Sequence, residues 1–442
     1  MKENLDPVMV FIHGGGFEFG GVNSNYSFIY GPQFFVQNDV VLVEIQYRLN
    51  IFGFLSFNDS KFGIPGNAGL KDQIMALKWI QSNIAEFGGD PNSVTIFGES
   101  AGAASVNLLY LSPLGKGLFH RAIAQSGAPT NPWVTGPNKA TELANVLNCP
   151  NGTVDEIVDC INSTSMDRLV SVGLRNLKAR MKHAHLRNGE MFVFTALTIE
   201  NGCSKSALIT KNPQEIAKNG EFNNLPIMMG YMAYEGYLFA RMNPVKPDFI
   251  DARDLIPKDI NIDLNSNEAV NLGKRIKEFY YGNTTQSYEN IDPYIDFLTD
   301  SLFVQQIYKF AKLYSTKSEN VYFYQFDYWT KLNMQNVYKL ETTKKLVTHF
   351  DDIAYLFYNP FNEYTKEDPN IQLGVYRLVK LWTTFAKTGN PNSPEDPLLN
   401  VTWLPIKSTN FNYLYINPTL ELKVDPDKER MLFWENIYAE YE

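Results

Sequence analysis

The hydrophobic positions of this chain recur with two different periods. Short apolar runs rich in β-branched residues predict strands at 8–12, 40–45, 94–97 and 121–125. Between these runs, apolar residues return every three or four positions over 70–86 and 101–109, which predicts helices. Strands that alternate with helices are typical of a parallel sheet covered on both faces. The pattern therefore predicts an α/β fold with a mostly parallel central sheet flanked by helices.

The second half of the chain continues this pattern after a more polar stretch. Further strands are predicted at 225–230, 320–326 and 413–416, and further helices at 301–315, at 373–388 and at the C-terminus. The region from roughly 130 to 220 is polar and weakly periodic, so we expect helical insertions that lie over the sheet. We interpret 1–442 as a single domain.

Composition excludes several classes of protein. With 442 residues, of which 44% are hydrophobic and 20% charged, the chain can bury a large core. Its formal net charge of −9 argues against a nucleic-acid partner, because phosphate binding needs clustered Lys and Arg. No apolar run reaches the length of about eighteen residues that predicts a transmembrane helix, and the N-terminus lacks a signal-peptide pattern.

The strongest chemical motif is Gly98-Glu99-Ser100-Ala101-Gly102, which lies between a predicted strand and a predicted helix. This is the pattern of a nucleophile elbow, in which a tight turn presents a serine and the flanking glycines avoid clashes. The amide of Ala101, at the start of the helix, is a candidate donor to an oxyanion. The alternative is a glycine-rich turn whose serine only caps the helix.

A second glycine motif, His13-Gly14-Gly15-Gly16-Phe17, follows the first predicted strand. Consecutive glycines let the backbone approach a substrate oxygen and turn its amides toward it. We expect the amides of Gly15 and Gly16 to complete an oxyanion hole with Ala101. A flexible glycine turn is the alternative. A phosphate-binding loop is not predicted, because no Gly-Lys-Ser/Thr follows.

A general base can be selected from the five histidines, which are His13, His120, His183, His185 and His349. In a fold with this elbow, the chain order is nucleophile, acid, histidine, with the histidine on a late loop. Only His349 satisfies that order. His120 is expected to pack or cap at a strand entry, and the basic segment that holds His183 and His185 is expected to be solvated.

The acid that orients the base should lie at a strand end between Ser100 and His349. Glu235 fits, because an apolar strand leads into a short loop and a glycine follows. The rivals are Asp248, Asp251 and Asp254, which suggest a solvated turn, and Asp351 and Asp352, which are too near His349 in sequence for triad geometry.

The positions of cysteine and asparagine residues indicate the cellular compartment in which the protein acts. Of the three cysteines, Cys149 and Cys160 could close a small loop, or all three, with Cys203, could be reduced thiols. Six Asn-x-Ser/Thr sequons begin at Asn25, Asn58, Asn151, Asn162, Asn283 and Asn400. These features favour an extracellular glycoprotein, with a cytoplasmic protein as the alternative.

The motifs together resemble the type-B carboxylesterase/cholinesterase family, and most closely the insect carboxylesterases. The resemblance rests on HGGGF, IQYRLNIFGFLS, the stretch from GNAGLKDQ to GESAGAAS, YEG and THFDDIAYLF. It implies an α/β-hydrolase fold and a serine esterase that needs no metal or cofactor. The family's catalytic triad falls on Ser100, Glu235 and His349, and its oxyanion hole falls on Gly15, Gly16 and Ala101.

The resemblance implies further roles and one departure. Glu99 matches an acidic position that lines the family's active-site gorge. Arg48 and Asp72 match a structural ion pair, and Cys149 and Cys160 match a disulfide loop of secreted relatives. Family members carry a segment before HGGGF, whereas this sequence begins almost at that motif, so the expected domain is N-terminally incomplete.

We therefore predict an enzyme that hydrolyses small carboxyl esters, xenobiotic or lipid-like ones among them, through an acyl-enzyme. Trp133 and Phe17 are candidates for lining an apolar acyl pocket. One alternative is a non-catalytic adhesion protein, although such relatives usually lose the serine or the histidine. The others are a binder that acylates quickly and deacylates slowly, and an inactive fragment.

Overall fold

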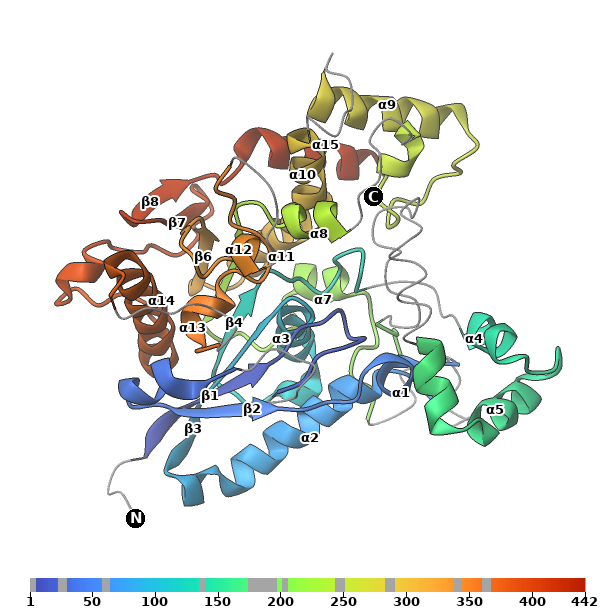
Figure 1. Cartoon of the computed structure of the whole chain (residues 1–442), viewed down its shortest axis with the longest axis horizontal. Helices are drawn as coiled ribbons and strands as arrows, with labels where there is room; N and C mark the ends of the chain where they lie inside the picture. Colours follow the sequence, from blue (N-terminus) through green and yellow to red (C-terminus); the bar gives the residue numbers. More distant parts are fainter. Residues whose placement is uncertain are drawn as a thin grey trace.

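The computed structural model describes residues 5–22, 30–57, 64–134, 140–173, 197–200, 206–242, 251–282, 291–337, 344–359 and 367–441. Through this part of the chain runs an eight-stranded sheet with the strand order β2-β1-β3-β4-β5-β6-β7-β8 (Figure 1). The strands are β1 (Asp6–Ile12), β2 (Val41–Ile45), β3 (Gly89–Glu99), β4 (Arg121–Gln125), β5 (Ile227–Met232), β6 (Val321–Phe326), β7 (Asn412–Ile416) and β8 (Glu421–Val424). All neighbouring pairs are parallel except β7 and β8. The predicted α/β fold class is confirmed.

Helices cover the sheet and extend beyond it. In chain order they are α1 (Asn50–Phe54), α2 (Ala68–Asn83), α3 (Ala101–Leu111), α4 (Ala140–Leu147), α5 (Val154–Ser163), α7 (Pro213–Asn219), α8 (Gly236–Met242), α9 (Asn267–Tyr281), α10 (Asp292–Thr299), α11 (Gln305–Ser315), α12 (Met334–Val337), α13 (Ile353–Leu356), α14 (Pro369–Thr388) and α15 (Lys428–Tyr441). The pair α4 and α5 lies at one margin of the molecule (Figure 1).

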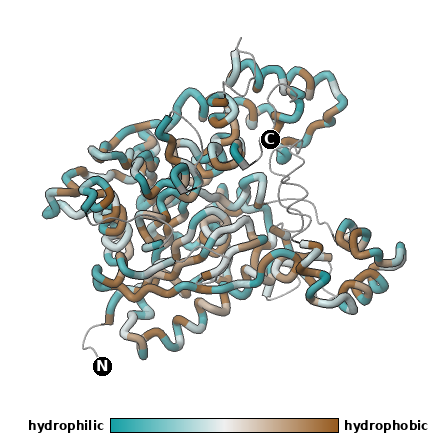
Figure 2. Tube along the Cα trace, in the orientation of Figure 1, coloured by the Kyte–Doolittle hydropathy of each residue, from teal (hydrophilic) through white to brown (hydrophobic). Residues whose placement is uncertain are grey.

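The strands bury both faces, as their continuous apolar runs predict. In β1, Val8 and Val10 pack in the core that contains α2, α3 and α11, whereas Met9 and Phe11 pack in the core that contains α13 and α14. The two cores lie on opposite sides of the sheet because successive side chains of a strand point in opposite directions. Figure 2 shows hydrophobic residues concentrated in the central strands and hydrophilic ones along the outer helices.

The predicted elements correspond closely to observed ones, although one predicted helix is interrupted and several observed elements, α9 and α10 among them, were not predicted. The predicted strand at 121–125 has the bounds of β4, and the predicted helix at 373–388 lies within α14, which Gly389 ends in the left-handed conformation. The helix predicted at 301–315 is interrupted, because Asp300–Val304 forms a π-helix before α11. Strand β8 was not predicted, because its short sequence, ELKV, alternates charged and apolar residues without an apolar run.

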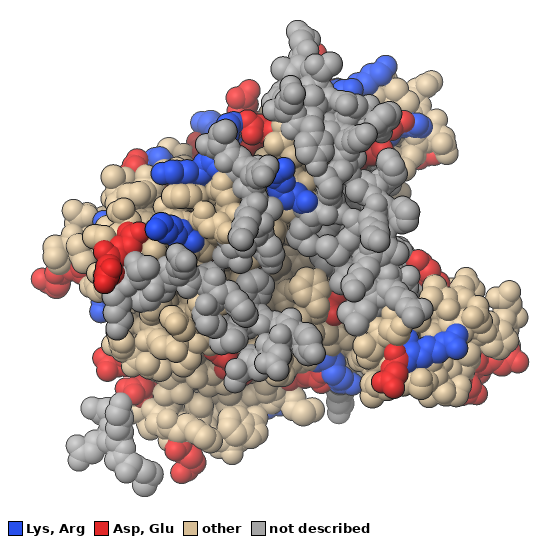
Figure 3. All heavy atoms as spheres, in the orientation of Figure 1, with Lys and Arg blue, Asp and Glu red and all other residues tan. Residues whose placement is uncertain are grey.

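The polar region from 130 to 220 contains helices α4, α5 and α7 in its described part, as expected of insertions. Among the described residues, no helix has both the length and the apolar character needed to cross a membrane. On the face drawn in Figure 3, acidic and basic side chains are interspersed.

Candidate active site

Ser100 occupies the turn between β3 and α3. Its backbone has φ 58° and ψ −121°, a conformation that residues other than glycine rarely adopt. Its amide donates to the carbonyl oxygen of Gln125 at 2.8 Å. The flanking glycines let the end of β1 approach the turn, since a Cβ atom would lie 2.6 Å from the oxygen of Ile12 at Gly98 and 1.9 Å from it at Gly102. The chain therefore forms a strained strand-turn-helix, which is the backbone geometry that a nucleophile elbow requires.

The glycine loop after β1 lies against this turn. A Cβ atom on Gly14 would lie 2.9 Å from the Cβ atom of Ser100. Gly15 and Gly16 have φ values of 105° and 61°, in the left-handed region that favours glycine. At Gly15 a Cβ atom would also lie 2.0 Å from the carbonyl oxygen of Phe19. These approaches explain why glycine is needed beside the serine.

Two further features hold this part of the site. Helix α3 begins at Ala101, directly after the serine, so its first amide and the helix dipole favour negative charge there. His13 belongs to the frame of the glycine loop, because its ring stacks on Tyr47 at a centroid distance of 4.5 Å and its carbonyl oxygen accepts from the Tyr47 hydroxyl at 2.8 Å. Burial lowers the pKa of His13, which disfavours its charged form.

Glu235 and His349 meet although they are far apart in sequence. Glu235 lies in the turn between β5 and α8, and its Oε2 is 2.6 Å from His349 Nδ1. Its Oε1 accepts from the amide of Met232 at 2.8 Å, and both side chains are buried. Because an ionised carboxylate can only accept, this contact places a proton on Nδ1. A neutral His349 would then have Nε2 as its proton acceptor.

Glu99 faces the other nitrogen of the same imidazole. Its Oε1 lies 3.1 Å from His349 Nε2, and neither carboxylate oxygen has a partner in hydrogen-bond geometry among the described residues. Burial raises the pKa of Glu99 well above its ordinary value, while His349 opposes that rise. Burial lowers the pKa of His349, but Glu99 and Glu235 outweigh it and raise the value to about 9. The acidic residue next to the serine therefore contacts the candidate base.

The rival acids and histidines are directed elsewhere. Asp352 accepts from Gln125 Nε2 at 2.7 Å, and Asp351 accepts from the amide of Thr348 at 2.7 Å. Burial raises the pKa of both aspartates to about 7. His120 Nδ1 accepts from the amide of Val94 at 3.1 Å, at the entry to β4. Outside the described residues lie His183, His185 and Asp248.

The remaining rivals, Asp251 and Asp254, belong to a surface turn. Asp251 forms an ion pair with Arg253 at 2.6 Å, and both side chains are substantially exposed. The carboxylate also caps the short helix from 252 to 255 by accepting from the amide of Arg253.

Aromatic side chains surround the imidazole. The ring centroid of Phe303 lies 4.5 Å from that of His349, and Phe239 lies 5.4 Å from it. Trp133 packs on Phe303 at 5.7 Å and donates from Nε1 to the carbonyl oxygen of Leu302 at 2.9 Å. The predicted pocket residue Trp133 therefore contacts Phe303, which in turn contacts His349.

Phe17, the other predicted pocket residue, is 3% exposed and packs on Phe54 at 4.8 Å. Sequence reasoning did not identify Phe239 and Phe303. Phe239 lies four residues after Glu235, one helical turn away, and that spacing was a usable signal. Phe303 lies in the π-helix, which the periodicity does not reveal.

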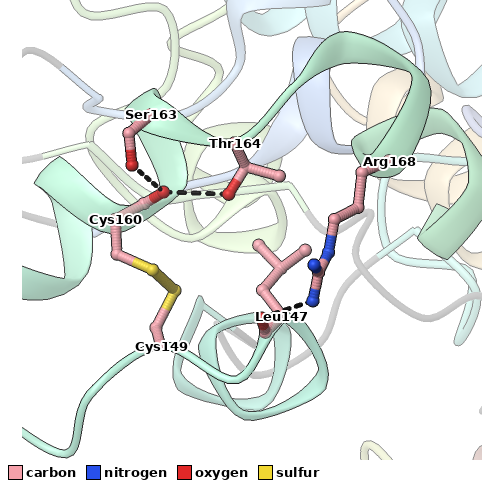
Figure 4. The surroundings of a disulfide bond; sticks show 6 residues. All are labelled: Leu147, Cys149, Cys160, Ser163, Thr164 and Arg168. Atoms are coloured by element: carbon pink, nitrogen blue, oxygen red, sulfur yellow. Dashed lines mark hydrogen bonds between the residues drawn. A yellow bond between two sulfur atoms is a disulfide. The ribbon is translucent and has the colours of Figure 1, made fainter.

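A disulfide joins Cys149 and Cys160, as the resemblance implies (Figure 4). The backbone oxygen of Cys160 also accepts from the hydroxyls of Ser163 and Thr164, each at 2.9 Å. Arg168 Nη2 donates to the carbonyl oxygen of Leu147 at 2.8 Å, so hydrogen bonds brace the unit on both sides of the disulfide. Cys203 lies outside the described residues.

The sequence also predicts glycosylation sites and a structural ion pair. The sequon residues Asn151, Asn162 and Asn400 are exposed, whereas Asn25, Asn58 and Asn283 lie outside the described residues. The expected ion pair is present, with Arg48 Nη2 2.7 Å from Asp72 Oδ1. In the described part of the chain, no group of three or more His, Cys, Asp or Glu side chains is arranged to hold a metal ion.

Comparisons with known proteins show which family the chain belongs to. The model of the carboxylesterase family matches residues 1–434. Juvenile hormone esterase of Tribolium castaneum is 32% identical over 97% of this chain and 77% of its own length. Esterase FE4 of Myzus persicae is 33% identical over 91% of this chain and 70% of its own, and carboxylesterase 1E of Rattus norvegicus is 32% identical over 99% and 75%. The crystal structure of juvenile hormone esterase from Manduca sexta, with OTFP covalently attached, has a TM-score of 0.83 and 27% identity, and the match covers 99% of this chain and 82% of that one.

Proposed function

Because the chain belongs to the carboxylesterase family and is an ester hydrolase, we propose that it cleaves carboxylic esters through a serine acyl-enzyme. Ser100 is the nucleophile, His349 the general base and Glu235 the acid that orients the base. The observation that carries this proposal is the 2.6 Å contact between Glu235 and His349 Nδ1, in a site that also contains the strained turn of Ser100. The covalent attachment of OTFP in the Manduca sexta relative also supports covalent chemistry.

The reaction proceeds in two steps. In the first, Ser100 Oγ attacks the ester carbonyl carbon as its proton passes to His349 Nε2, and the protonated imidazole then donates that proton to the departing alcohol. In the second, water attacks the acyl-enzyme, its proton passes to Nε2, and the return of this proton to Ser100 releases the acid. Glu235 holds the imidazole with Nδ1 protonated throughout and stabilises the imidazolium, without taking the proton itself.

Negative charge develops on the carbonyl oxygen in both steps. The amides of Gly15 and Gly16, whose φ values are positive, and of Ala101, at the start of α3, are the proposed donors to that oxygen. Preorganised amides stabilise an oxyanion strongly, and the loss of one donor typically costs about 3 kcal/mol in the transition state. The close approach of the loop to Ser100 supports this arrangement, because the donors must lie beside the attacked carbonyl.

The aromatic rings beside His349 favour esters with an apolar group. Phe303, Phe239 and Trp133 form a continuous set of ring contacts that reaches the imidazole. An apolar acyl or alcohol group packs favourably against such rings, because its removal from water is favourable. The proposed substrates are therefore xenobiotic or lipid-like esters. Phe17, which packs on Phe54, is a further candidate for contact with their apolar groups.

Two measurements on one preparation test the proposal. A fluorophosphonate probe should label the protein, and labelling should disappear in Ser100→Ala. Hydrolysis of a p-nitrophenyl ester should continue over many turnovers. A burst of product equal to the enzyme concentration, followed by little more, would instead identify a stoichiometric binder. If the folded parent protein is not labelled, the serine mechanism is refuted.

We also propose that the protein acts in the secretory pathway or outside the cell. The disulfide between Cys149 and Cys160 supports an oxidising compartment. The exposed sequons at Asn151, Asn162 and Asn400 support glycosylation there.

A further inference from the structure

His349 is carried by a strained turn. The amide of Asp351 donates to the carbonyl oxygen of Thr348 at 3.1 Å, which closes the turn over 348–351. Within it, Phe350 has φ 76°, a left-handed conformation that is unfavourable for a bulky residue. Such a conformation persists only when surrounding contacts hold it. The position of the imidazole therefore depends on what restrains this turn.

One restraint connects the turn to the acid. Thr348 Oγ1 accepts from the amide of Leu238 at 2.9 Å and lies 3.4 Å from the carbonyl oxygen of Glu235, to which it donates. These contacts tie the residue before His349 to the segment that carries Glu235.

The second restraint is the buried carboxylate of Asp351. Its Oδ2 accepts from the amide of Thr348 and from Asn333 Nδ2, each at 2.7 Å, and its Oδ1 accepts from the amide of Met334 at 2.6 Å. The carboxylate thus joins the histidine turn to the loop after β6. All three partners are N–H donors, so the ionised carboxylate satisfies them and a neutral amide of the same shape cannot.

The loop on the far side of this carboxylate is itself fixed. Asn333 Oδ1 accepts from the amide of Thr330 at 2.7 Å and from the hydroxyl of Tyr355 at 2.8 Å. The carbonyl oxygen of Tyr328 lies 3.0 Å from the same hydroxyl and shares its single proton with Asn333 Oδ1. These groups are buried, where a broken hydrogen bond is costly. Asp351 therefore connects the turn to a rigid support.

We propose that Asp351 is a positioning residue for His349: its carboxylate holds the strained turn so that the imidazole reaches both Glu235 and the substrate. This inference rests on the proposed function, in which His349 is the base. Asp351 acts through the backbone of Thr348 and does not touch the reacting atoms. Its removal should therefore impair proton transfer more than substrate binding.

The test compares Asp351→Asn with Gln335→Leu. Gln335 links the same two loops, because its Oε1 accepts from Trp329 Nε1 and the amide of Leu346, and its Nε2 donates to the carbonyl oxygen of Lys344. Both substitutions should lower Tm. Only Asp351→Asn should reduce kcat for a p-nitrophenyl ester, by about 100-fold, with KM nearly unchanged, because misplacing a reacting group by about 1 Å costs that much.

Proton NMR gives a second readout that instability alone does not produce. The resonance of the proton shared by His349 Nδ1 and Glu235 should shift or broaden in Asp351→Asn and stay at its parental position in Gln335→Leu. If Asp351→Asn does not fold, Asn333→Ala takes its place in the test. This substitution removes one of the three donors to Asp351 and should lower kcat by a smaller factor.

The outcomes separate the two proposals. Parental kcat in folded Asp351→Asn, or in Asn333→Ala where the former does not fold, would overturn the positioning role. An equal loss of kcat in Gln335→Leu would overturn it as well. Absence of fluorophosphonate labelling in the parent protein would instead overturn the serine mechanism on which the role depends.

Discussion

Replacing Glu235 with glutamine changes one atom of the proposed triad and leaves its shape. The amide oxygen of the new side chain would keep the hydrogen bond from the amide of Met232, which now goes to Glu235 Oε1 at 2.8 Å. Its NH₂ group would then face His349 Nδ1 at the position of the 2.6 Å contact. Because that group can only donate, the imidazole must place its proton on Nε2. The base would hold the wrong tautomer and could not accept the proton of Ser100.

The expected loss in kcat is about 10⁴-fold, the size seen when the acid of a serine triad becomes its amide, or about 5 kcal/mol of transition-state stabilisation. Steady-state hydrolysis of a p-nitrophenyl ester measures it. The matched control is Glu200→Gln, which alters another buried glutamate, bonded to Asn67 Nδ2 and the amide of Leu208. That variant should lower Tm and keep kcat. A Glu235→Gln enzyme that stays within about tenfold of the parent kcat would refute the assignment of the acid.

Three further predictions follow from groups around the site and at the margin of the fold. Burial lowers the pKa of His349, but the carboxylates outweigh it and raise the value to about 9. Since only the neutral imidazole accepts a proton, kcat/KM for an uncharged ester should rise with pH, with the midpoint of the rise near pH 9. Glu99→Gln removes the carboxylate that lies 3.1 Å from Nε2, so the midpoint of the pH profile should move to lower pH, and an unmoved midpoint would contradict the coupling. Replacing Cys149 and Cys160 with serine opens a loop with a sequence separation of 11. On the chain-entropy model this lowers the free energy of unfolding by about 3 kcal/mol, visible in calorimetry as a lower Tm, and a change in kcat would contradict the peripheral role of the unit. After secretory expression, peptide-N-glycosidase should reduce the mass of the protein, and the shift should become smaller in Asn151→Gln, Asn162→Gln and Asn400→Gln; a mass unchanged by the enzyme would exclude N-glycans.

Sequence reasoning can place a residue in the fold where the backbone of one segment decides the geometry. The turn at Ser100 lies between a strand and a helix that the local pattern predicts, and the glycines beside it are required by contacts with Ile12. Glu235 follows the apolar run of β5, and strand ends of a parallel sheet lie at one edge. The positions of both residues could therefore be expected without any knowledge of side-chain contacts.

The same reasoning did not reach features set by tertiary contacts. The π-helix at Asp300–Val304 adds a residue to one helical turn, and no change in the apolar pattern marks it. Asn131 Nδ2 donates to the carbonyl oxygens of Leu302 and Phe303, at 2.8 Å and 3.0 Å. A partner 171 positions away along the chain thus satisfies backbone groups of this segment. Local sequence propensity cannot predict such a contact.

Among the described residues, Glu99, Glu235 and Asp352 act on the charge of His349, and Asp351 follows it by two positions. The hydrogen-bond partners of these carboxylates distinguish them. Glu235 has one oxygen on a backbone amide and the other on Nδ1, so it can orient the base. Both oxygens of Asp351 are occupied by N–H groups, which suits a support and excludes direct contact with the ring. Asp352 is held by Gln125, whereas Glu99 has no hydrogen bond among the described residues and lies beside Nε2. Since all four side chains end in a carboxylate, the role of each one follows from its hydrogen-bond donors, and only the folded chain brings those donors together.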